Sequence, residues 1–405
     1  MTQHIFINGG VFETRLALMA GERLVECRHL PFGAADQFAP APLPVAGTLC
    51  LGRITRMAAE LEAAFVDIGF EAPGFLPVSA MPAGARPSEG ALLAVRIAKS
   101  AFDDKGPKLS ARLSPEQSAL ARPHLSAGSA RPGPLPGGLP GLAEAVAGLA
   151  RAETPERVEV DHALAYARLK AELPSPLAGA LARAPEGDLF ARHHIGGQIE
   201  AALEPIMPLT GGGNLIIEPT SALTAIDVNS GGMGGAKLRQ RLNLAAAKAI
   251  PPALRLRGIG GQVVIDFLPM RRPEQQQAVM AALKTSCRPD PARIKISRMT
   301  SGGLVALTRE RARPSLAAEL LAPAANPAPS PSPGAGANAM LRALAREARG
   351  PGGRNFRLAA AADIAAWLEG RGDFRLAAGR EFGINLEFVL DETLEPGIWR
   401  LERNP

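Results

Sequence analysis

Leu-Thr-Ala-Ile-Asp-Val-Asn-Ser (223–230) and Gly-Gly-Gln-Val-Val-Ile-Asp-Phe (260–267) are the two segments that decide the fold of this chain. Both are short apolar runs rich in β-branched residues, the pattern of buried strands, and each run stops at an aspartate. The stretch between them, 237–257, is amphipathic and predicts a helix that connects two parallel strands. The two strands would then place Asp227 and Asp266 side by side at one edge of a sheet.

Two carboxylates at one sheet edge indicate a cation site. Burying an ionised carboxylate is costly unless it meets a cation or hydrogen-bond donors. Carboxylate oxygens favour a hard ion such as Mg²⁺ over zinc, and such an ion polarises a phosphodiester. Asn229 lies two residues after Asp227 and therefore on the same face of the strand. The alternative is that each aspartate only caps a turn, but two in matching contexts, Asp227 and Asp266, favour a site.

The bulk composition is that of an ordinary folded protein. The chain has 405 residues, of which 46% are hydrophobic and 21% charged, enough for about two to four domains. A net charge of +6 weakly favours a polyanionic partner. The amino terminus lacks the pattern of a secretion signal, and no apolar run reaches the roughly 20 residues of a membrane helix.

The three cysteines, Cys27, Cys50 and Cys287, are isolated in sequence. No Cys-x-x-Cys pair occurs, which excludes the usual zinc-ribbon spacing and gives no disulfide framework. We therefore expect a cytoplasmic protein.

The motif residues resemble a known family. Ile-Asp-Val-Asn-Ser (226–230) and Leu-Arg-Gly-Ile-Gly-Gly-Gln-Val-Val-Ile-Asp-Phe (256–267) resemble the catalytic segment of the ribonuclease E/G family of endoribonucleases. The resemblance implies that Asp227 and Asp266 hold a catalytic Mg²⁺ and that Asn229 assists. It also implies an α+β and α/β multidomain fold, with an RNase H-like and DNase I-like catalytic core, an inserted OB-fold barrel and a small C-terminal α/β module.

The expected domain order follows from the composition together with this resemblance. The expected parts are N-terminal strands (1–40), an OB-fold RNA-binding domain (45–112), a Pro/Gly-rich linker (113–156), an RNase H-like helical part (157–208), a catalytic DNase I-like subdomain (209–321), a low-complexity linker (322–337) and a C-terminal module (338–405).

The OB-type prediction for 45–112 depends on four or five short strands separated by glycine turns. Phe65 and Phe75 lie on adjacent expected strands, with Arg53 and Lys105 nearby in sequence. Exposed aromatic rings flanked by cations bind single-stranded nucleic acid, whereas in the alternative interpretation both rings belong to the core. The resemblance implies that Phe65, Phe75 and Lys105 contact RNA.

Basic residues follow the second aspartate segment. Arg309 and Arg311 belong to a cationic stretch that would clamp phosphates beside a scissile bond, so we predict them as RNA contacts. Pro251 and Pro252 are expected to end or kink the preceding helix. The histidine pair 193–194 has no ligand partner at a suitable spacing and is interpreted as packing or surface residues.

Two features of larger relatives are missing from the sequence. The paired cysteines of their zinc link are absent, so we expect no structural zinc, and any oligomer would form without a zinc link. The Val-Arg-Thr-Ala-Gly segment that recognises an RNA 5′-monophosphate is also absent, so the chain resembles a short form that lacks this sensor segment.

The leading hypothesis is a Mg²⁺-dependent endoribonuclease that cleaves single-stranded RNA. One alternative is a non-catalytic RNA-binding protein that uses the barrel and has a degenerate nuclease site. A weaker one is a DNA nuclease, because two carboxylates and Mg²⁺ do not select the sugar.

Overall fold

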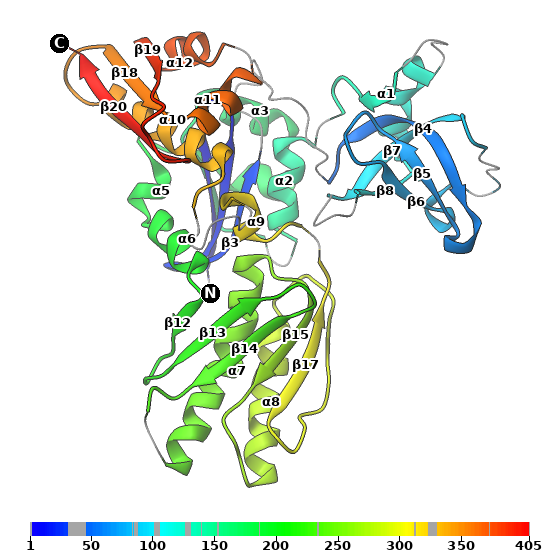
Figure 1. The fold of residues 1–405 in the computed structure, drawn as a ribbon, viewed down its shortest axis with the longest axis vertical. Helices are drawn as coiled ribbons and strands as arrows, with labels where there is room; N and C mark the ends of the chain where they lie inside the picture. Colours follow the sequence, from blue (N-terminus) through cyan, green and yellow to red (C-terminus); the bar gives the residue numbers. More distant parts are fainter. Residues whose placement is uncertain are drawn as a thin grey trace. The chain divides into compact units, whose positions relative to one another are not determined.

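The fold is known from a computed structural model, in which the chain forms two compact units (Figure 1). The larger unit combines Met1–Ala39 with Val146–Pro405, and the smaller is Pro40–Ala145. The structure describes residues 2–30, 46–82, 84, 88–100, 106–125, 131–138, 140–151, 154–185, 187–232, 235–311, 313–322, 330–371 and 373–404.

The larger unit contains the sheet that the two aspartate segments predict. Across this sheet the strands are β12 (Ile206–Pro208), β13 (Asn214–Pro219), β14 (Thr224–Asn229), β15 (Gly261–Asp266), β17 (Leu304–Arg309) and β16 (Ile294–Ile296). β14 and β15 pair in parallel, and the other neighbours are antiparallel. The predicted connecting helix is α7 (Ala236–Arg257), and α8 (Pro273–Cys287) follows β15.

Side chains of this sheet alternate between a buried face and an open face. Ile226 and Val228 of β14 and Ile265 of β15 are buried in one core with residues of α7 and α8. In Figure 1 the strands lie in front of these helices. A one-residue slip would exchange the two faces, so apolar burial fixes the register. The open face consists of Asn214, Ile216, Glu218, Ala225, Asp227, Asn229, Gln262, Val264, Asp266, Leu304, Ala306 and Thr308, which are exposed or half-buried.

Helix α7 continues through Pro251 and Pro252, so of the two predicted outcomes, an end or a kink, the end is wrong. It runs to Arg257 and is followed by Gly258, whose φ of 66° terminates the helix in the left-handed conformation. Each proline removes one backbone donor and costs up to about 3 kcal/mol in a helix interior. Ile250 and its neighbours are buried in the core beneath the sheet, and this packing offsets that cost.

A second sheet in the larger unit is built mainly from the N-terminal strands. Its strands are, in order, β11 (Leu181–Arg183), β10 (Arg157–Val160), β1 (Gln3–Gly9), β2 (Thr14–Ala20) and β3 (Arg23–Leu30). β1 pairs in parallel with β10 and antiparallel with β2, so segments far apart in sequence meet in this sheet. The associated helices are α3 (Ala163–Glu172), α4 (Ser175–Ala180), α5 (Leu189–Arg192), α6 (Ile195–Leu203) and α9 (Leu316–Leu320).

The C-terminal residues form a module with its own core. Three strands in the order β19 (Asn385–Leu390), β18 (Asn355–Ala360), β20 (Trp399–Asn404) pack on α10 (Pro333–Arg349), α11 (Ala362–Glu369) and α12 (Phe374–Phe382). These residues form an α/β module, and Phe12 from the N-terminal segment joins its core.

The smaller unit contains a closed five-stranded barrel of OB-like form, which confirms the mixed α+β expectation. The closed circuit is β5 (Ala63–Asp67), β6 (Gly74–Pro77), β8 (Lys108–Ser110), β7 (Leu92–Lys99) and β4 (Leu49–Ala58), with β4 pairing back to β5. The short β9 (Gly133–Pro134) adds to β4, and α1 (Pro115–Leu125) also contacts that strand.

Two expected linkers contain regular structure. Within 113–156 the structure has α1, β9 and α2 (Leu142–Leu149), and Val146 of α2 is fully buried. Within 322–337, Ser332 caps the first residues of α10, while 323–329 lie outside the described residues. In the described parts of these two stretches, proline and glycine therefore lie at or near the ends of short elements.

Among the described residues, no helix combines the length and the apolar character needed to cross a membrane.

Replacing Pro252 with Ala should stabilise the larger unit, because Ala restores a backbone donor to the carbonyl of Lys248. We expect the free energy of unfolding to rise by about 1 kcal/mol, less than the full helix penalty because proline also restricts the unfolded chain. Calorimetry would detect a higher transition temperature. The control Ala249→Gly, on the same helix, should lower it, and a decrease for Pro252→Ala would contradict this account.

Candidate active site

The parallel pairing of β14 and β15 brings Asp227 and Asp266 together. Their Cα atoms are direct register partners, and neighbouring strands lie about 4.8 Å apart. Both side chains are exposed on the open face, and Asn229 lies on the same face two residues beyond Asp227. Residues that are far apart in sequence thus form one acidic couple at the carboxyl end of two strands.

The acidic couple has no cationic partner among the described residues. Partial burial, followed by the charges of Asp266 and Glu218, raises the pKa of the Asp227 carboxyl above its usual value. Asp161, in contrast, accepts hydrogen bonds from Asn8 Nδ2 at 2.6 Å and from the Gly9 N–H at 3.0 Å. Repulsion that the protein leaves uncompensated at Asp227 and Asp266 is typical of a ligand site.

The donor set suits a hard divalent cation. Two adjacent carboxylates supply charge, and neutral amide oxygens are common additional ligands. Asn214 is the register partner of Asn229, and its Oδ1 is buried without a hydrogen-bond partner. Among the described residues, no cluster of three or more His, Cys, Asp or Glu side chains has metal-binding geometry. Asp227 and Asp266 are therefore the residues that would hold the ion.

Two contacts position the acidic couple. Asn243 of α7 is fully buried, and its amide donates to the Leu268 carbonyl at 2.8 Å and accepts from the Leu268 N–H at 3.0 Å. These two hydrogen bonds fix the chain just beyond Asp266 to helix α7. At the neighbouring turn, Gly213 has a φ of 70°, and a Cβ there would lie 2.4 Å from the Asn229 carbonyl oxygen. Only glycine permits this close approach.

The barrel unit carries a transverse row of aromatic and cationic residues. Phe65 and Phe75 are register partners with ring centroids 5.9 Å apart in an edge-to-face arrangement. The Arg56 guanidinium lies 4.6 Å from the Phe65 centroid, and the exposed Lys108 is the register partner of Phe75. Both phenylalanines are half-buried and lie outside the barrel core, so they are available to stack on a ligand.

Arg53 and Lys105 are the other two RNA contacts that the sequence predicts in the barrel unit. Arg53 is exposed on β4 and donates to the Gly90 carbonyl at 3.1 Å. Lys105 lies outside the described residues.

Arg309 does not lie on an exposed surface, contrary to the prediction. It is 7% exposed, its Nε donates to Asp290 Oδ2 at 2.8 Å, and its Nη1 donates to the Ile259 carbonyl at 2.8 Å. Arg311 is half-buried and donates to the Gly260 carbonyl at 3.2 Å. Alternation along β17 turns the Arg309 side chain toward the buried face. Its hydrogen bonds there stabilise the fold.

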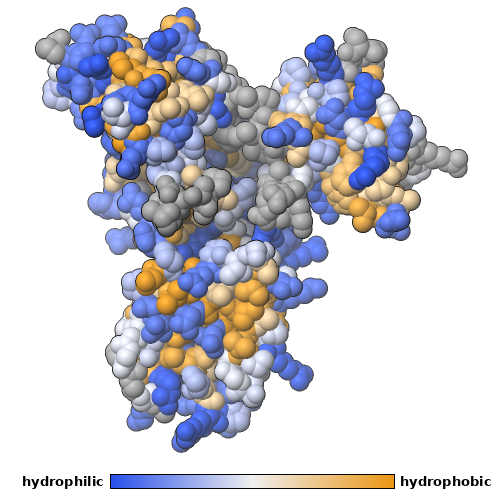
Figure 2. All heavy atoms as spheres, in the orientation of Figure 1, coloured by the Kyte–Doolittle hydropathy of each residue, from blue (hydrophilic) through white to orange (hydrophobic). Residues whose placement is uncertain are grey.

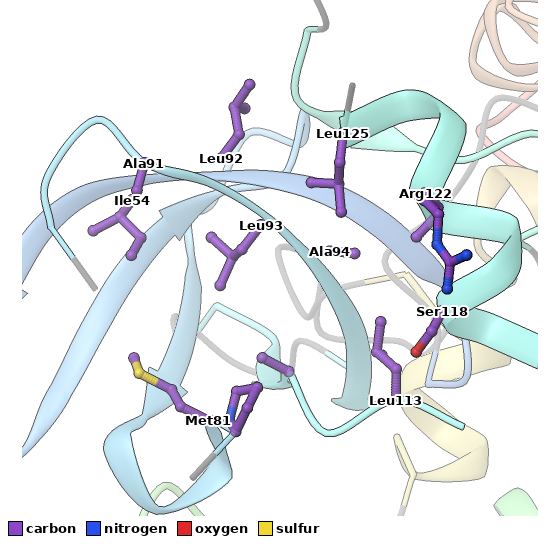
Figure 3. A pocket seen from close by; sticks show the side chains of 13 residues that line it. Ile54, Met81, Ala91, Leu92, Leu93, Ala94, Leu113, Ser118, Arg122 and Leu125 are labelled. Atoms are coloured by element: carbon purple, nitrogen blue, oxygen red, sulfur yellow. The ribbon is translucent and has the colours of Figure 1, made fainter. Parts of the chain in front are cut away.

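A hollow of about 490 Å³ lies in the barrel unit next to α1 (Figure 3). Its lining is mostly aliphatic, including Leu93 and Leu113, with Ser118 and Arg122 on the helix side. Among the described residues that line it, no pair of titratable groups suits acid–base or metal chemistry. We therefore place the candidate chemistry at the acidic couple.

Sequence inspection missed Glu218, Asn214 and Asn243. No spacing rule singles them out, because they reach the site from β13 and from α7 through register and packing. The histidine pair 193–194 was interpreted as packing or surface residues: His193 stacks on Phe6 with ring centroids 4.0 Å apart, and His194 is exposed.

The fold and the site together define a mixed α/β protein with an OB-like barrel and, at a sheet edge, two carboxylates that have no cationic partner in the described part of the chain. Residues 142–312 match the model of the Ribonuclease E/G family. Ribonuclease E from Haemophilus influenzae is 42% identical over 135 residues, 32% of this chain and 14% of that protein. Ribonuclease E from Escherichia coli K12 is 42% identical over 132 residues, 32% of this chain and 12% of that protein.

Ribonuclease G from the same Escherichia coli strain is 33% identical over 172 residues, 40% of this chain and 35% of that protein. The chain thus spans well under half the length of the relatives it matches. Residues 142–312, which include both aspartates, are therefore the part of this chain that is similar to the Ribonuclease E/G family. The barrel lies outside that match, so its predicted likeness to the family's RNA-binding domain stays a prediction.

Replacing Asp266 with Asn should stabilise the folded protein slightly, because it removes the charge that repels Asp227. We expect a gain of about 0.5 kcal/mol or less at neutral pH, since exposed charges are screened. A raised pKa means that folding disfavours the ionised form, so the gain should shrink as pH falls through the Asp227 pKa. Thermal denaturation without divalent ions, at several pH values, measures it.

The matched control is Asp161→Asn. Its carboxylate is satisfied by Asn8 and Gly9, so the amide should lower the transition temperature. Equal destabilisation by both variants would show that Asp266 is an ordinary structural residue.

Proposed function

We propose that this protein is a Mg²⁺-dependent endoribonuclease that cleaves single-stranded RNA, with a role in RNA processing or decay. The observation that carries the proposal is the register pairing of Asp227 with Asp266, two carboxylates without a cationic partner among the described residues. The family match over 142–312 and the names of the similar ribonucleases support the same conclusion.

Each residue at the site has a distinct role in this proposal. Asp227 and Asp266 hold the cation and fix it at the rim of the sheet. Asn229 accepts a hydrogen bond from the Gly231 N–H at 2.8 Å, which leaves its amide N–H groups to orient a carboxylate or a phosphate oxygen. A bound Mg²⁺ would polarise the phosphodiester and lower the pKa of a water molecule for attack on phosphorus.

The barrel unit supplies RNA affinity in this proposal. Phe65 and Phe75 would stack on bases of a single strand, and Arg56 and Lys108 at the two ends of the same row would contact its phosphates. Arg53 on the neighbouring exposed position of β4 would add a further cation, and Lys105 stays a proposed RNA contact. A net charge of +6 agrees with a polyanionic substrate.

We further infer the affiliations of the two sheets. The strand order β11-β10-β1-β2-β3, with β1 parallel to β10, supports an RNase H-like subdomain. The one-sided sheet with two helices behind it supports the DNase I-like catalytic subdomain. We also propose a cytoplasmic location and an oligomer, if one forms, that does not depend on zinc.

A second candidate is an RNA-binding protein that does not cleave. The aromatic row of the barrel favours it, since that row alone would bind single strands. A DNA nuclease is the third candidate, because two carboxylates and Mg²⁺ do not discriminate the sugar.

Replacing either aspartate with Asn should abolish cleavage of a single-stranded, AU-rich RNA oligonucleotide while leaving RNA affinity within about twofold. Replacing Phe65 or Phe75 with Ala should have the opposite effect, weakening binding by about tenfold per lost stacked base. Gel-based cleavage assays and fluorescence anisotropy separate the two effects. Assays with Mg²⁺ or EDTA, on RNA and DNA of the same sequence, distinguish the three candidates. Unchanged turnover in Asp227→Asn would remove the nuclease assignment.

Cation affinity should fall as the pH is lowered, starting at a higher pH than for an ordinary aspartate. Asp227 must be ionised to hold Mg²⁺, and its pKa is raised partly by Glu218. Glu218→Gln should therefore move the whole profile to lower pH. The stabilisation of the fold by about 10 mM Mg²⁺, measured as a shift in transition temperature, reports the affinity.

The control for this profile is Glu387→Gln, on an exposed strand of the C-terminal module. It should leave the profile unchanged. A profile that is the same in Glu218→Gln and the wild type would show that Glu218 does not act on the site.

A further inference from the structure

The acidic couple is the middle of a longer row across the open face. In β13, the register partner of Asp227 is Ile216, and in β17 the register partner of Asp266 is Leu304. The row therefore reads Ile216, Asp227, Asp266, Leu304 over four adjacent strands. At about 4.8 Å per strand, the two aliphatic side chains flank the carboxylates with their Cα atoms roughly 14 Å apart.

Neither flanking side chain belongs to the hydrophobic core. Leu304 is 42% exposed, and Ile216 is half-buried, although core residues occupy the alternate positions of both strands. In Figure 2, the part of the molecule that contains β12–β17 shows hydrophobic patches among hydrophilic ones. Branched side chains that flank an acidic couple outside the core, one exposed and one half-buried, have no evident role in folding.

The row is complementary to a dinucleotide step. The central carboxylates suit a cation and, through it, the anionic phosphodiester. A nucleobase presents an uncharged, apolar face, and burying such a face against aliphatic carbon is favourable. A strand whose phosphate lies at the acidic couple would place the two adjoining bases over the two flanking side chains.

We propose that Ile216 and Leu304 are specificity-determining residues that contact the bases on either side of the scissile phosphodiester. This inference rests on the proposed nuclease function and adds two base subsites to it. Contacts of this kind carry no hydrogen-bond code, so they sense the presence and size of a base rather than its identity.

The test combines protein variants with abasic substrates. In a single-stranded RNA with one cleavage site, an abasic nucleotide on either side of the cleaved bond should lower wild-type kcat/KM about tenfold. Leu304→Ala should lower kcat/KM by a similar factor on intact RNA, and lower it no further when the abasic nucleotide is on the side that Leu304 contacts. Ile216→Ala should show the same insensitivity for the other side.

The matched control is Leu390→Ala, which truncates a leucine of similar exposure, 48%, in the C-terminal module. Leu390→Ala should leave kcat/KM unchanged on both the intact and the abasic RNA. The inference would be overturned if the loss from Leu304→Ala or Ile216→Ala added in full to the loss from the abasic nucleotide on the contacted side. It would also be overturned if the variants changed the oligomeric state or lowered the transition temperature without a base-dependent effect, which would indicate that another protein surface covers this row.

A binding measurement separates this inference from the proposed function. In an Asp266→Asn background, anisotropy of a short fluorescent RNA tests the same combinations without turnover. If the wild type cleaves RNA but the variants respond equally to intact and abasic strands, only the base subsites are wrong. If no cleavage occurs, the nuclease proposal fails, and the binding data alone then support or reject the base contacts.

Discussion

The structure of the candidate site depends on one pairing, that of β14 with β15. Parallel strands require a crossover, and α7 provides it while burying its apolar side under both strands. Once Ile226 and Ile265 are buried, alternation leaves Asp227 and Asp266 no position except the open face, in the same row. The hydrophobic effect thus supplies the free energy that holds two like charges together.

Other acidic residues of the protein show what an ordinary structural carboxylate requires. Asp161 accepts bonds from Asn8 and Gly9, and Asp290 pairs with Arg309. At Asp227 no cation among the described residues offsets the charge, and partial burial, followed by the charges of Asp266 and Glu218, raises the pKa of the carboxyl. Uncompensated repulsion at a rigid sheet edge is a cost to stability that a bound cation would remove, which is how stability and function come to oppose each other at such sites.

The predictions from sequence succeeded where a short-range pattern controls the structure and failed where distant packing does. Period-two alternation identified the strands and placed Asp227 and Asn229 on one face. The same pattern could not show that Arg309 meets Asp290, because that contact depends on how β17 packs against the turn after α8. Proline rules suggested that α7 ends or kinks at Pro251 and Pro252, yet the helix continues through them because burial of its core-facing side outweighed two missing backbone donors.

The sequence by itself determined the two strand-end aspartates, the helix between them and the family over 142–312, because each is encoded in a contiguous run of residues. Only the tertiary structure decided which residues surround those aspartates. Glu218, Asn214, Ile216 and Leu304 lie on neighbouring strands, β13 and β17, whose register cannot be read from the sequence. The physical reason is that strand register follows from burying one complete sheet face at once, a long-range condition that no local pattern contains.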